Sequence, residues 1–334
     1  MKKIHFALIG AGKMGTRWAL VLPKSINATL DVIVSMHLDR AKGLASQIPQ
    51  CKATNNIGDV LNNKGIDAIV IATPHSSLSL ITRMAFKAGK HVLCEKPGAI
   101  HSHDIKKNIA LAKKMGLTYM IGYNHRFHDG FIKARSLYQK GTIGKIIFIR
   151  ARYGFCGRPG YDKEWRLDRS INGGGHLIDQ GVHMIDLAMS FIGKIQKVQG
   201  FTSDTFWKKG TEDNAFVLLQ GKNKVIASIH TSLTQWKALH NFEIYGTKGY
   251  LSIEGLGMKY GGEEKLIIGK RAKDFTGEVK EKVIACNSVA DDSLALELKE
   301  FISAIRQERS TTPSPNDAYE TLKIVEKIYS DNKL

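Results

Sequence analysis

Three side chains in this sequence have the types and spacing needed for proton transfer beside a reacting hydroxyl or carbonyl. Lys96 lies in a Glu-Lys-Pro triplet after an apolar run, and Asp179 and His183 follow a run of three glycines. Histidine suits proton transfer because its unperturbed pKa lies near neutrality. Asp179 and His183 are four residues apart, so on a helix they would share one face, where the carboxylate could orient the imidazole. A lysine cation could stabilise the charge that develops on an alkoxide oxygen.

A glycine pattern near the N-terminus predicts a dinucleotide-binding turn. Gly10, Gly12 and Gly15 follow the first apolar run and precede an amphipathic one. In such a turn, the first glycine permits the tight bend, the second admits a pyrophosphate, and the third lets helix and strand pack closely. The N–H groups of the following helix would face the phosphates. We therefore expect the cofactor to contact Gly10, Ala11, Gly12, Lys13, Met14 and Gly15.

The end of the second expected strand bears on the choice between NAD and NADP. In NAD enzymes an acidic residue about 20 residues past the glycines binds the ribose 2′-hydroxyl. Here the position is Ser35, and Arg40 follows at the start of the next expected helix. Nothing in this stretch repels a 2′-phosphate, and the Arg40 guanidinium could hold one. The sequence therefore predicts NAD(P) as the cofactor and favours NADP, with Ser35 and Arg40 at the site.

The composition and charge of the chain indicate which partners and which compartment to expect. The chain has 334 residues, 43% hydrophobic and 24% charged, with a formal net charge of +18. The lysines are spread along the chain, so we expect a solvated basic surface and steering of anionic ligands, with neither a nucleic-acid nor a membrane partner. The four cysteines are far apart, without a CxxC pair, which favours the reducing cytoplasm over a disulfide framework.

One cluster of polar residues resembles a metal-binding group. His176, Asp179, His183 and Asp186 contain only metal-ligating side-chain types. Their helical spacing would not bring all four to one ion, so no metal is expected. We interpret Asp186 as a structural residue.

The first part of the chain, up to residue 123, alternates short β-branched runs with longer amphipathic runs. This alternation predicts a parallel sheet covered by helices on both faces. Strands are expected at 4–9, 30–34, 68–72, 91–94 and 119–122. Helices are expected at 13–22, 39–48, 78–88 and 102–115.

After residue 124 the expected strands follow one another with little helix between them, which predicts a largely antiparallel sheet. They cover 146–153, 198–202, 215–219, 225–233, 242–245 and 250–253, and helices are expected at 294–305 and 317–329. The segment 154–172 has no period, as expected of a loop over a binding site. Within it, Tyr161, Trp165 and Arg166 offer hydrogen-bond donors and an aromatic ring for a sugar or phosphate. The expected domains are a dinucleotide-binding domain at 1–123, an α+β substrate-binding and oligomerisation domain at 124–312, and a C-terminal helix at 313–334 that packs back on the first domain.

Five segments in fixed order resemble the Gfo/Idh/MocA family of sugar and inositol oxidoreductases. They are GAGKMG, ATPHSS, AGKHVLCEKP, GYNHRF and GGGHLIDQGVHMIDL, and they extend over nearly the whole chain. The resemblance implies an N-terminal Rossmann domain followed by an open-faced mixed sheet, whose exposed face forms a homodimer or homotetramer. The sequence departs from the family pattern at Ser35, where many members have an acid, and at Leu78, where many have a histidine.

The resemblance also implies roles for individual residues. Lys96 matches the catalytic lysine, in a Lys-Pro peptide that is often cis, and Asp179 and His183 match the paired acid and proton-transferring histidine. Implied or expected cofactor contacts beyond the glycine turn are Thr73, Pro74, Glu95, Lys96, Asn124, Trp165 and Arg166. Implied or expected substrate contacts are Lys96, Arg126, Tyr161, Trp165, Asp179 and His183.

These features predict an NAD(P)-dependent oxidoreductase acting on a secondary alcohol or ketone. The expected substrate is a sugar, an inositol or a sugar nucleotide, and the net positive charge suits a phosphorylated or nucleotide-linked one. Two alternatives remain open. One is a glycosidase that retains NAD and forms a transient keto sugar, and the other is a sugar-sensing regulator without catalysis. The presence of both Lys96 and His183 weighs against the regulator.

Overall fold

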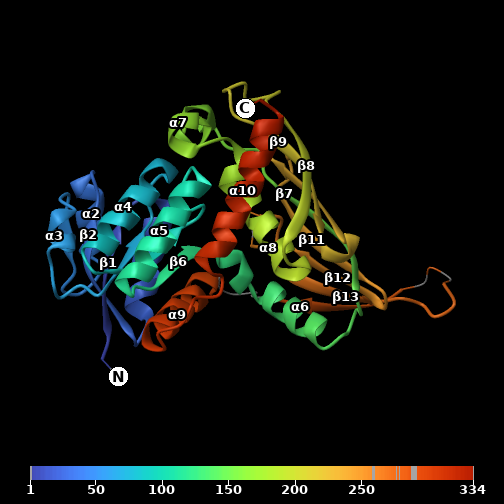
Figure 1. Ribbon diagram of the computed structural model, residues 1–334, viewed down its shortest axis with the longest axis horizontal. Helices are drawn as coiled ribbons and strands as arrows, with labels where there is room; N and C mark the ends of the chain where they lie inside the picture. Colours follow the sequence, from blue (N-terminus) through green and yellow to red (C-terminus); the bar gives the residue numbers. More distant parts are fainter. Residues whose placement is uncertain (1, 258–259, 276, 278, 287–291, 334) are drawn as a thin grey trace. The chain divides into compact units, whose positions relative to one another are not determined.

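The computed structural model describes residues 2–257, 260–275, 277, 279–286 and 292–333 (Figure 1). It forms two compact units. Unit 1 comprises Met1–Tyr123 and Leu294–Glu320, and unit 2 comprises Asn124–Ser293 and Thr321–Leu334.

The C-terminal region is divided differently from the domains expected from the sequence. Residues 294–320 group with unit 1, because Phe301 packs on Phe6 with ring centroids 6.2 Å apart and Arg306 donates to the side chain of Asn27. The segment 321–334 groups with unit 2, where Tyr329 reaches the buried Glu212. The final helix therefore begins in one unit and ends in the other.

Unit 1 contains a six-stranded sheet in the order β3-β2-β1-β4-β5-β6, with every pair parallel. This is the strand order of the doubly wound dinucleotide-binding fold. The strands are β1 (Ile4–Ile9), β2 (Ala28–Val34), β3 (Lys52–Thr54), β4 (Ala68–Ile71), β5 (His91–Glu95) and β6 (Tyr119–Gly122). Every residue of β4 is buried, as expected for a central strand of a parallel sheet. The predicted fold of this region is confirmed.

The helices of unit 1 lie between these strands, apart from one that follows the unit 2 strands in the sequence. They are α1 (Lys13–Val21), α2 (Leu38–Ala45), α3 (Gly58–Leu61), α4 (His75–Lys87), α5 (Ser102–Met115) and α9 (Ser293–Arg306), with a 3₁₀ turn at Leu22–Lys24. Gly116 ends α5 in the left-handed conformation that glycine adopts without strain. The sequence reading missed β3 and α3, since three and four residues are too few to show a period.

Unit 2 contains an eight-stranded sheet in the order β14-β13-β12-β11-β7-β10-β9-β8. Only β7 and β10 pair in parallel, and the other pairs are antiparallel, which confirms a largely antiparallel mixed sheet. The strands are β7 (Ile146–Gly154), β8 (Ile195–Ser203), β9 (Asn214–Gly221), β10 (Ile226–Ser232), β11 (Leu239–Gly246), β12 (Gly249–Glu254), β13 (Lys265–Lys270) and β14 (Lys280–Ala285).

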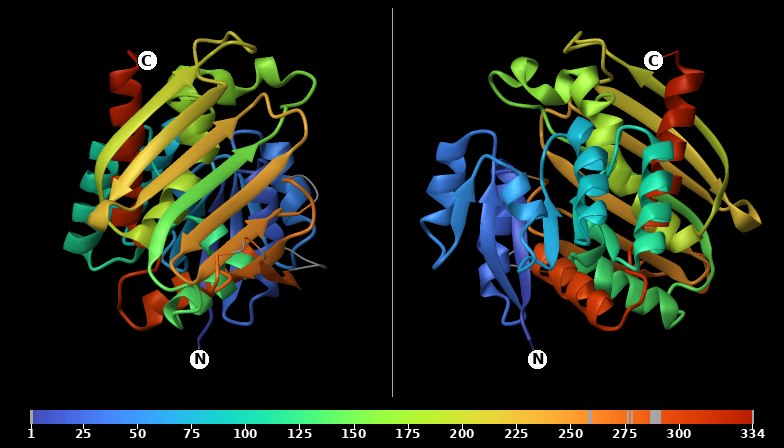
Figure 2. Two further views of the ribbon diagram at one scale, coloured as in Figure 1. Left: turned by 90° about the vertical axis from the view of Figure 1, so that its right-hand side faces the viewer. Right: turned by 60° about the vertical axis from the view of Figure 1, so that its left-hand side comes forward.

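The two faces of this sheet differ in cover. Burial alternates along β9 and β10, so one face of each strand is enclosed and the other exposed. On the enclosed side α8 (Val182–Ile192) packs against β7 and β10. The other face is turned toward the viewer in the left panel of Figure 2, and no helix of the described residues lies over it. It exposes large apolar side chains that include Phe148, Phe216 and Leu218.

Unit 2 has more helix than the sequence reading expected. Besides α8 it contains α6 (Asp129–Gln139), α7 (Arg169–Asn172) and the end of α10 (Pro315–Asp331). A π-helical turn runs from Leu177 to Gly181, and 3₁₀ turns cover Asn124–Phe127, Tyr161–Lys163, Trp165–Leu167 and Lys222–Lys224. The segment 154–172, expected to be a loop without a period, contains short helical turns at 161–163, 165–167 and 169–172.

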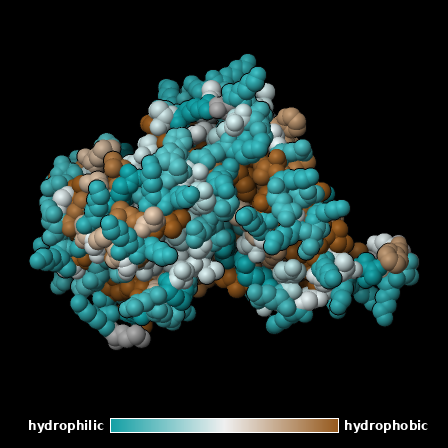
Figure 3. Space-filling model, viewed as in Figure 1, coloured by the Kyte–Doolittle hydropathy of each residue, from teal (hydrophilic) through white to brown (hydrophobic). Residues whose placement is uncertain are grey.

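The surface of the protein varies in hydropathy (Figure 3). The face shown in Figure 3 is largely hydrophilic, with separate apolar patches. In the described part of the chain no helix combines the length and apolarity that crossing a bilayer requires.

Candidate active site

The glycine turn of unit 1 has the steric features of a phosphate-binding turn. Gly10 adopts φ +109°, and a Cβ added to it would lie 2.3 Å from the carbonyl oxygen of Ala72. A Cβ on Gly15 would lie 1.9 Å from the carbonyl oxygen of Gly10. A Cβ on Gly12, which precedes α1, would meet no atom within 4 Å. The first and third glycines are therefore required by packing, and the second leaves open space at a helix N-terminus, where a pyrophosphate fits.

Several expected cofactor residues lie at the carboxyl-terminal edge of the unit 1 sheet. Ser35 follows β2, Thr73 and Pro74 follow β4, and Lys96 follows β5. Because the strands are parallel, these positions share one edge with the glycine turn after β1. The strand order reverses between β1 and β4, which is where open α/β sheets bind ligands.

The first turn of α4 fixes the segment after β4. Ser77 donates through Oγ to Thr73 Oγ1 at 2.8 Å and lies 2.9 Å from the carbonyl oxygen of Pro74. Leu78, on the next turn, is fully buried. Thr73 therefore stays half-buried at the sheet edge, with its position set by α4.

Glu95 and Lys96 have different environments although they are adjacent. Glu95 is buried and accepts a hydrogen bond from Trp18 Nε1 at 2.8 Å. Burial raises the pKa of the Glu95 carboxyl, and the Trp18 hydrogen bond and the Lys96 charge oppose that rise. Lys96 is half-buried and joins Pro97 through a cis peptide. Glu95 thus lies inside unit 1, and Lys96 is the more accessible of the two.

The residues after β2 are open to solvent. The backbone N–H of His37 donates to Ser35 Oγ at 3.1 Å, which shapes the turn into α2. Arg40 is exposed on the first turn of α2, and its guanidinium makes no hydrogen bond or ion pair with any residue the structure describes. It is therefore available to an anionic ligand.

In unit 2 Asp179 lies within the π-helical turn that leads into α8. It is buried, and its Oδ2 lies 3.4 Å from Nε of Arg166. Arg166 also lies 3.2 Å from Glu164 Oε2, and its guanidinium carbon is 4.6 Å from the Trp165 ring centroid. Burial lowers the pKa of Arg166, and the carboxylates of Asp179 and Glu164 more than reverse that effect. The expected acid and the expected Trp-Arg pair are thus brought together.

A buried glutamate that the sequence reading missed holds the π-helical turn. Glu212 accepts the backbone N–H groups of Gly175 and Leu177 at 2.8 and 2.9 Å and the hydroxyl of Tyr329 at 2.7 Å. Burial raises its pKa, and these hydrogen bonds oppose the rise. A Cβ on Gly175 would lie 2.0 Å from the Glu212 carbonyl oxygen, which explains a glycine there. These contacts join residues 35 or more positions apart, so no local pattern could reveal them.

Tyr329→Phe should lower the free energy of unfolding by about 1–3 kcal/mol, because it removes one hydrogen bond to a buried carboxyl group. Urea denaturation measures the change. Tyr138→Phe is the matched control, since the Tyr138 hydroxyl makes no hydrogen bond with any described residue. Equal stability of the Tyr329 variant and wild type would contradict the proposed brace.

His183 is stacked on a second histidine that the sequence reading did not assign. The rings of His125 and His183 are 3.8 Å apart and inclined by 15°. His125 also meets the ring of His128 edge-on, and His128 Nδ1 lies 2.9 Å from Glu264 Oε2. All four side chains are buried. The stack fixes the plane of the His183 ring; the only sequence signal was the position of His125 inside the GYNHRF segment.

Arg126 and Asn124 have partners within unit 2. Arg126 donates through Nε and Nη2 to the two carboxylate oxygens of Asp186 at 2.7 and 2.5 Å. Asn124 donates through Nδ2 to Ser293 Oγ at 3.0 Å. This bidentate pair holds the Arg126 guanidinium against Asp186, in keeping with the interpretation of Asp186 as a structural residue.

Tyr161 lies among aromatic rings. Its side chain is buried, with ring centroids 5.9 Å from Phe155 and 5.6 Å from Trp207, and the Arg158 guanidinium lies 5.2 Å from its centroid. Burial and the nearby Asp179 carboxylate raise the pKa of its hydroxyl. Tyr161 is thus a neutral hydroxyl in the same region of unit 2 as Asp179.

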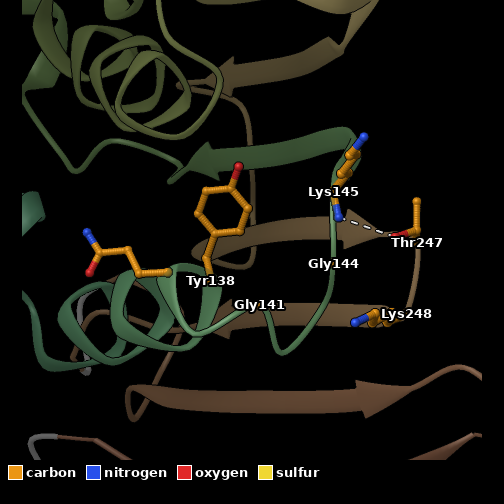
Figure 4. Close-up of a pocket in the computed structure, with 7 residues that line it drawn as sticks. Tyr138, Gly141, Gly144, Lys145, Thr247 and Lys248 are labelled. Atoms are coloured by element: carbon orange, nitrogen blue, oxygen red, sulfur yellow. Dashed lines mark hydrogen bonds between the residues drawn. The ribbon is translucent and has the colours of Figure 1, made fainter.

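A shallow depression elsewhere in unit 2 holds none of the expected site residues. Figure 4 shows it at the end of α6 and the turn between β11 and β12, where the Lys145 N–H donates to Thr247 Oγ1 at 3.2 Å. Its lining residues are Tyr138, Gln139, Gly141, Gly144, Lys145, Thr247 and Lys248. Two surface lysines and a hydroxyl group provide no acid–base pair, so we assign no chemistry to it. Within the described ranges, no group of three or more His, Cys, Asp or Glu side chains is arranged to hold a metal ion.

Lys96 belongs to unit 1, and Asp179 and His183 belong to unit 2. Each side chain has a defined environment within its own unit. That all three meet at one cofactor stays a prediction.

Both units contain segments that match families of known proteins. Residues 4–123 match the oxidoreductase family with an NAD-binding Rossmann fold, and residues 131–252 match the GFO/IDH/MocA C-terminal domain. A 1,5-anhydro-D-fructose reductase of Ensifer adhaerens is 27% identical over 252 residues, 74% of each protein. A myo-inositol 2-dehydrogenase of Thermotoga maritima is 26% identical over 255 residues, again 74% of each.

Solved structures share the fold. A levoglucosan dehydrogenase in complex with NADH and L-sorbose superposes with a TM-score of 0.87 at 22% identity, covering 99% of this chain and 98% of that one. A UDP-N-acetylglucosamine 3-dehydrogenase from Acidithiobacillus ferrooxidans has a TM-score of 0.83 at 20% identity, with 100% and 99% covered. At these identities the likeness establishes the fold alone.

Proposed function

The chain belongs to the Gfo/Idh/MocA family of oxidoreductases, and we propose that it transfers hydride between NAD(P) and a secondary alcohol or ketone of a sugar, an inositol or a nucleotide sugar. The observation that carries this proposal is the edge of the unit 1 sheet. Gly12 leaves open space at the N-terminus of α1, and Thr73 and Lys96 follow neighbouring strands at the same edge. Relatives that act on an anhydrofructose and on myo-inositol support a polyhydroxylated substrate.

The proposed chemistry assigns the proton transfer to His183 and Lys96, with Asp179 in a positioning role. When bound, the nicotinamide ring supplies the hydride acceptor or donor. His183 takes the hydroxyl proton when an alcohol is oxidised and returns it when a ketone is reduced. Lys96 joins His183 in this proton relay, and its cationic form beside the same oxygen stabilises the developing negative charge. Asp179, paired with Arg166, holds the substrate hydroxyl or the imidazole in position.

We also propose that the cofactor is NADP. The guanidinium of the exposed Arg40 has no partner among the described residues, and Ser35 provides a hydroxyl where an acid would repel a phosphate. A guanidinium suits the 2′-phosphate because it offers several N–H donors in a planar fork.

Arg40→Ala should weaken NADPH binding by roughly tenfold, the effect of losing about 1.4 kcal/mol of charge-assisted hydrogen bonding, and leave NADH binding nearly unchanged. Fluorescence titration of both reduced cofactors measures the effect. Lys42→Ala, which removes an exposed cation later in α2, serves as the control. An equal loss for the two cofactors would refute the assignment of Arg40.

Titration with NADH and NADPH followed by a turnover screen of sugars, inositols and sugar nucleotides tests the function. The proposal requires a steady rise in absorbance at 340 nm when oxidised cofactor and substrate are added. A glycosidase that retains its cofactor would instead release hydrolysed sugar without that rise. A regulator would bind cofactor and sugar without changing either.

We also propose how the chain assembles and in which compartment it acts. We propose a homodimer or homotetramer formed through the uncovered face of the unit 2 sheet, where Phe148, Phe216 and Leu218 are exposed. Apolar side chains gathered on one face favour burial against a second copy. The four cysteines are free, in keeping with our assignment to the reducing cytoplasm.

A further inference from the structure

An exposed pair of aromatic side chains lies outside the site described so far. Phe206, between β8 and β9, is 54% exposed, and Trp236, between β10 and β11, is 63% exposed. Their ring centroids are 5.0 Å apart and the rings are inclined by 73°. Two large rings left in water on neighbouring loops are costly, because burying such a ring is worth on the order of 1.5–3 kcal/mol. We call this pair the aromatic platform.

The loop that carries Phe206 is held rigidly. The buried carboxylate of Asp213 accepts three successive backbone N–H groups through Oδ2, from Thr205, Phe206 and Trp207 at 3.1, 2.7 and 3.1 Å. Its Oδ1 accepts a further hydrogen bond from Asn214 Nδ2 at 3.0 Å. The indole N–H of Trp207 donates to the Leu233 carbonyl at 3.1 Å. Phe206 is therefore positioned by its own loop, so stacking of a ligand on this ring would cost little loop entropy.

The platform is continuous with the expected substrate residues of unit 2. Phe206 contacts Trp207 at 5.3 Å between centroids, and Trp207 contacts Tyr161 at 5.6 Å. Tyr161 in turn lies within electrostatic range of Asp179 and Arg166. A ligand with one end at Asp179 and a second ring at the platform would need to be longer than a monosaccharide.

The surroundings of the platform are rich in cations. Lys208 and Lys237 flank the two rings in sequence and are exposed, and neither makes an ion pair with a described residue. Lys209 lies 4.0 Å from Asp162, and Arg158 pairs with Glu164. The two unpaired ammonium groups complement phosphate oxygens, which a neutral oligosaccharide lacks.

We propose that Phe206, Trp236, Lys208 and Lys237 form a subsite for the nucleoside diphosphate part of a nucleotide-linked sugar. The base stacks on the platform, the lysines face the diphosphate, and the sugar extends past Tyr161 toward Asp179. This inference rests on the proposed function, and it narrows the substrate to a sugar nucleotide. The bond changes at the sugar are those already proposed, so the subsite contributes binding and positioning.

Isothermal titration with UDP, CDP, GDP and dTDP tests the subsite, with the cofactor site first saturated by NADPH. At least one of these probes should bind. Trp236→Ala and Phe206→Ala should each weaken that binding by roughly 5- to 150-fold, the range for loss of one base-stacking contact. Lys237→Glu should also weaken nucleotide binding. This loss of affinity should grow as ionic strength falls, because like charges then repel over a longer distance. Phe275→Ala, which removes another exposed ring, should have no effect.

The titration measures nucleotide binding and not turnover. Its outcome can therefore refute the subsite without refuting the proposed oxidoreductase activity. Nucleotide binding that is unaffected by the platform variants, or no binding of any probe, overturns the subsite. Should the variants instead change the sedimentation coefficient without changing nucleotide affinity, the platform is a contact between copies of the chain and the proposal is wrong. Trp236 and Phe206 are exposed, so both variants should fold, and circular dichroism checks that they do.

Discussion

Lys96→Ala is expected to lower turnover by about 10²–10⁴, the range for loss of a group that acts on the proton in the transition state. NADPH affinity should change little, because the pyrophosphate depends on the glycine turn. Single-turnover oxidation of the reduced cofactor, followed at 340 nm with saturating substrate, separates the chemical step from binding. Unchanged turnover would exclude Lys96 from the reaction.

The adjacent Glu95 calls for a control in this experiment, because the Lys96 charge opposes the burial-driven rise in its pKa. Lys96→Arg keeps a cation beside Glu95 but cannot release a proton. We expect this variant to be stable and nearly as slow as Lys96→Ala. Lys106→Ala, an exposed lysine on α5, should match wild type. If arginine restored full turnover, Lys96 would act only as a fixed charge.

His183→Ala should cause a loss of similar size, about 10²–10⁴ in turnover, because the general acid–base group is removed. Proton inventory and single-turnover measurements at saturating cofactor would locate the loss in the proton-transfer step. Recovery of activity on adding imidazole would support this role directly. Normal turnover in the alanine variant would contradict it.

The stack with His125 makes a second substitution informative. His183→Phe keeps an aromatic ring against His125, and therefore preserves the packing, but cannot transfer a proton. It should be as slow as His183→Ala and more stable to urea. His230→Phe is the control, because His230 is also stacked on a ring, that of Phe216 at 4.1 Å, and has no proposed catalytic role. Activity in His183→Phe would show that the ring is needed only for packing.

The sequence predicts unit 1 well because its signals are local. Five of its six strands are short runs rich in apolar residues, and the glycine turn is specified by residues within six positions. The structure adds what spacing cannot show, namely that the Gly10 position is closed by the Ala72 carbonyl while Gly12 is open.

Unit 2 was predicted less completely because its signals are distant or weak. β14 is exposed at five of six positions, so it shows no alternation, as is common for a lysine-rich edge strand. The π-helical turn that carries Asp179 depends on Glu212 and Tyr329, and no helical period indicates it. α6 was missed although Phe131 and Ala134 lie on its buried face. The neighbouring strand-like runs favoured a sheet and not a helix in this part of the chain.

Within the candidate site, the sequence identified residue types but not their partners. It proposed Arg126 for the substrate, and the structure pairs its guanidinium with Asp186. It assigned no role to His125, which proves to stack on His183. Such pairs join residues about 60 positions apart, so only the folded chain reveals them.

A structure of the protein with NADPH and a turned-over substrate tests the central claim most directly, through the distances from Lys96 Nζ and His183 Nε2 to the substrate oxygen beside nicotinamide C4. The account predicts that both nitrogens lie within hydrogen-bond reach of that oxygen, about 2.6–3.2 Å. If either group points into a different pocket while the cofactor and substrate are bound, the proposed Lys96 and His183 proton transfer is wrong.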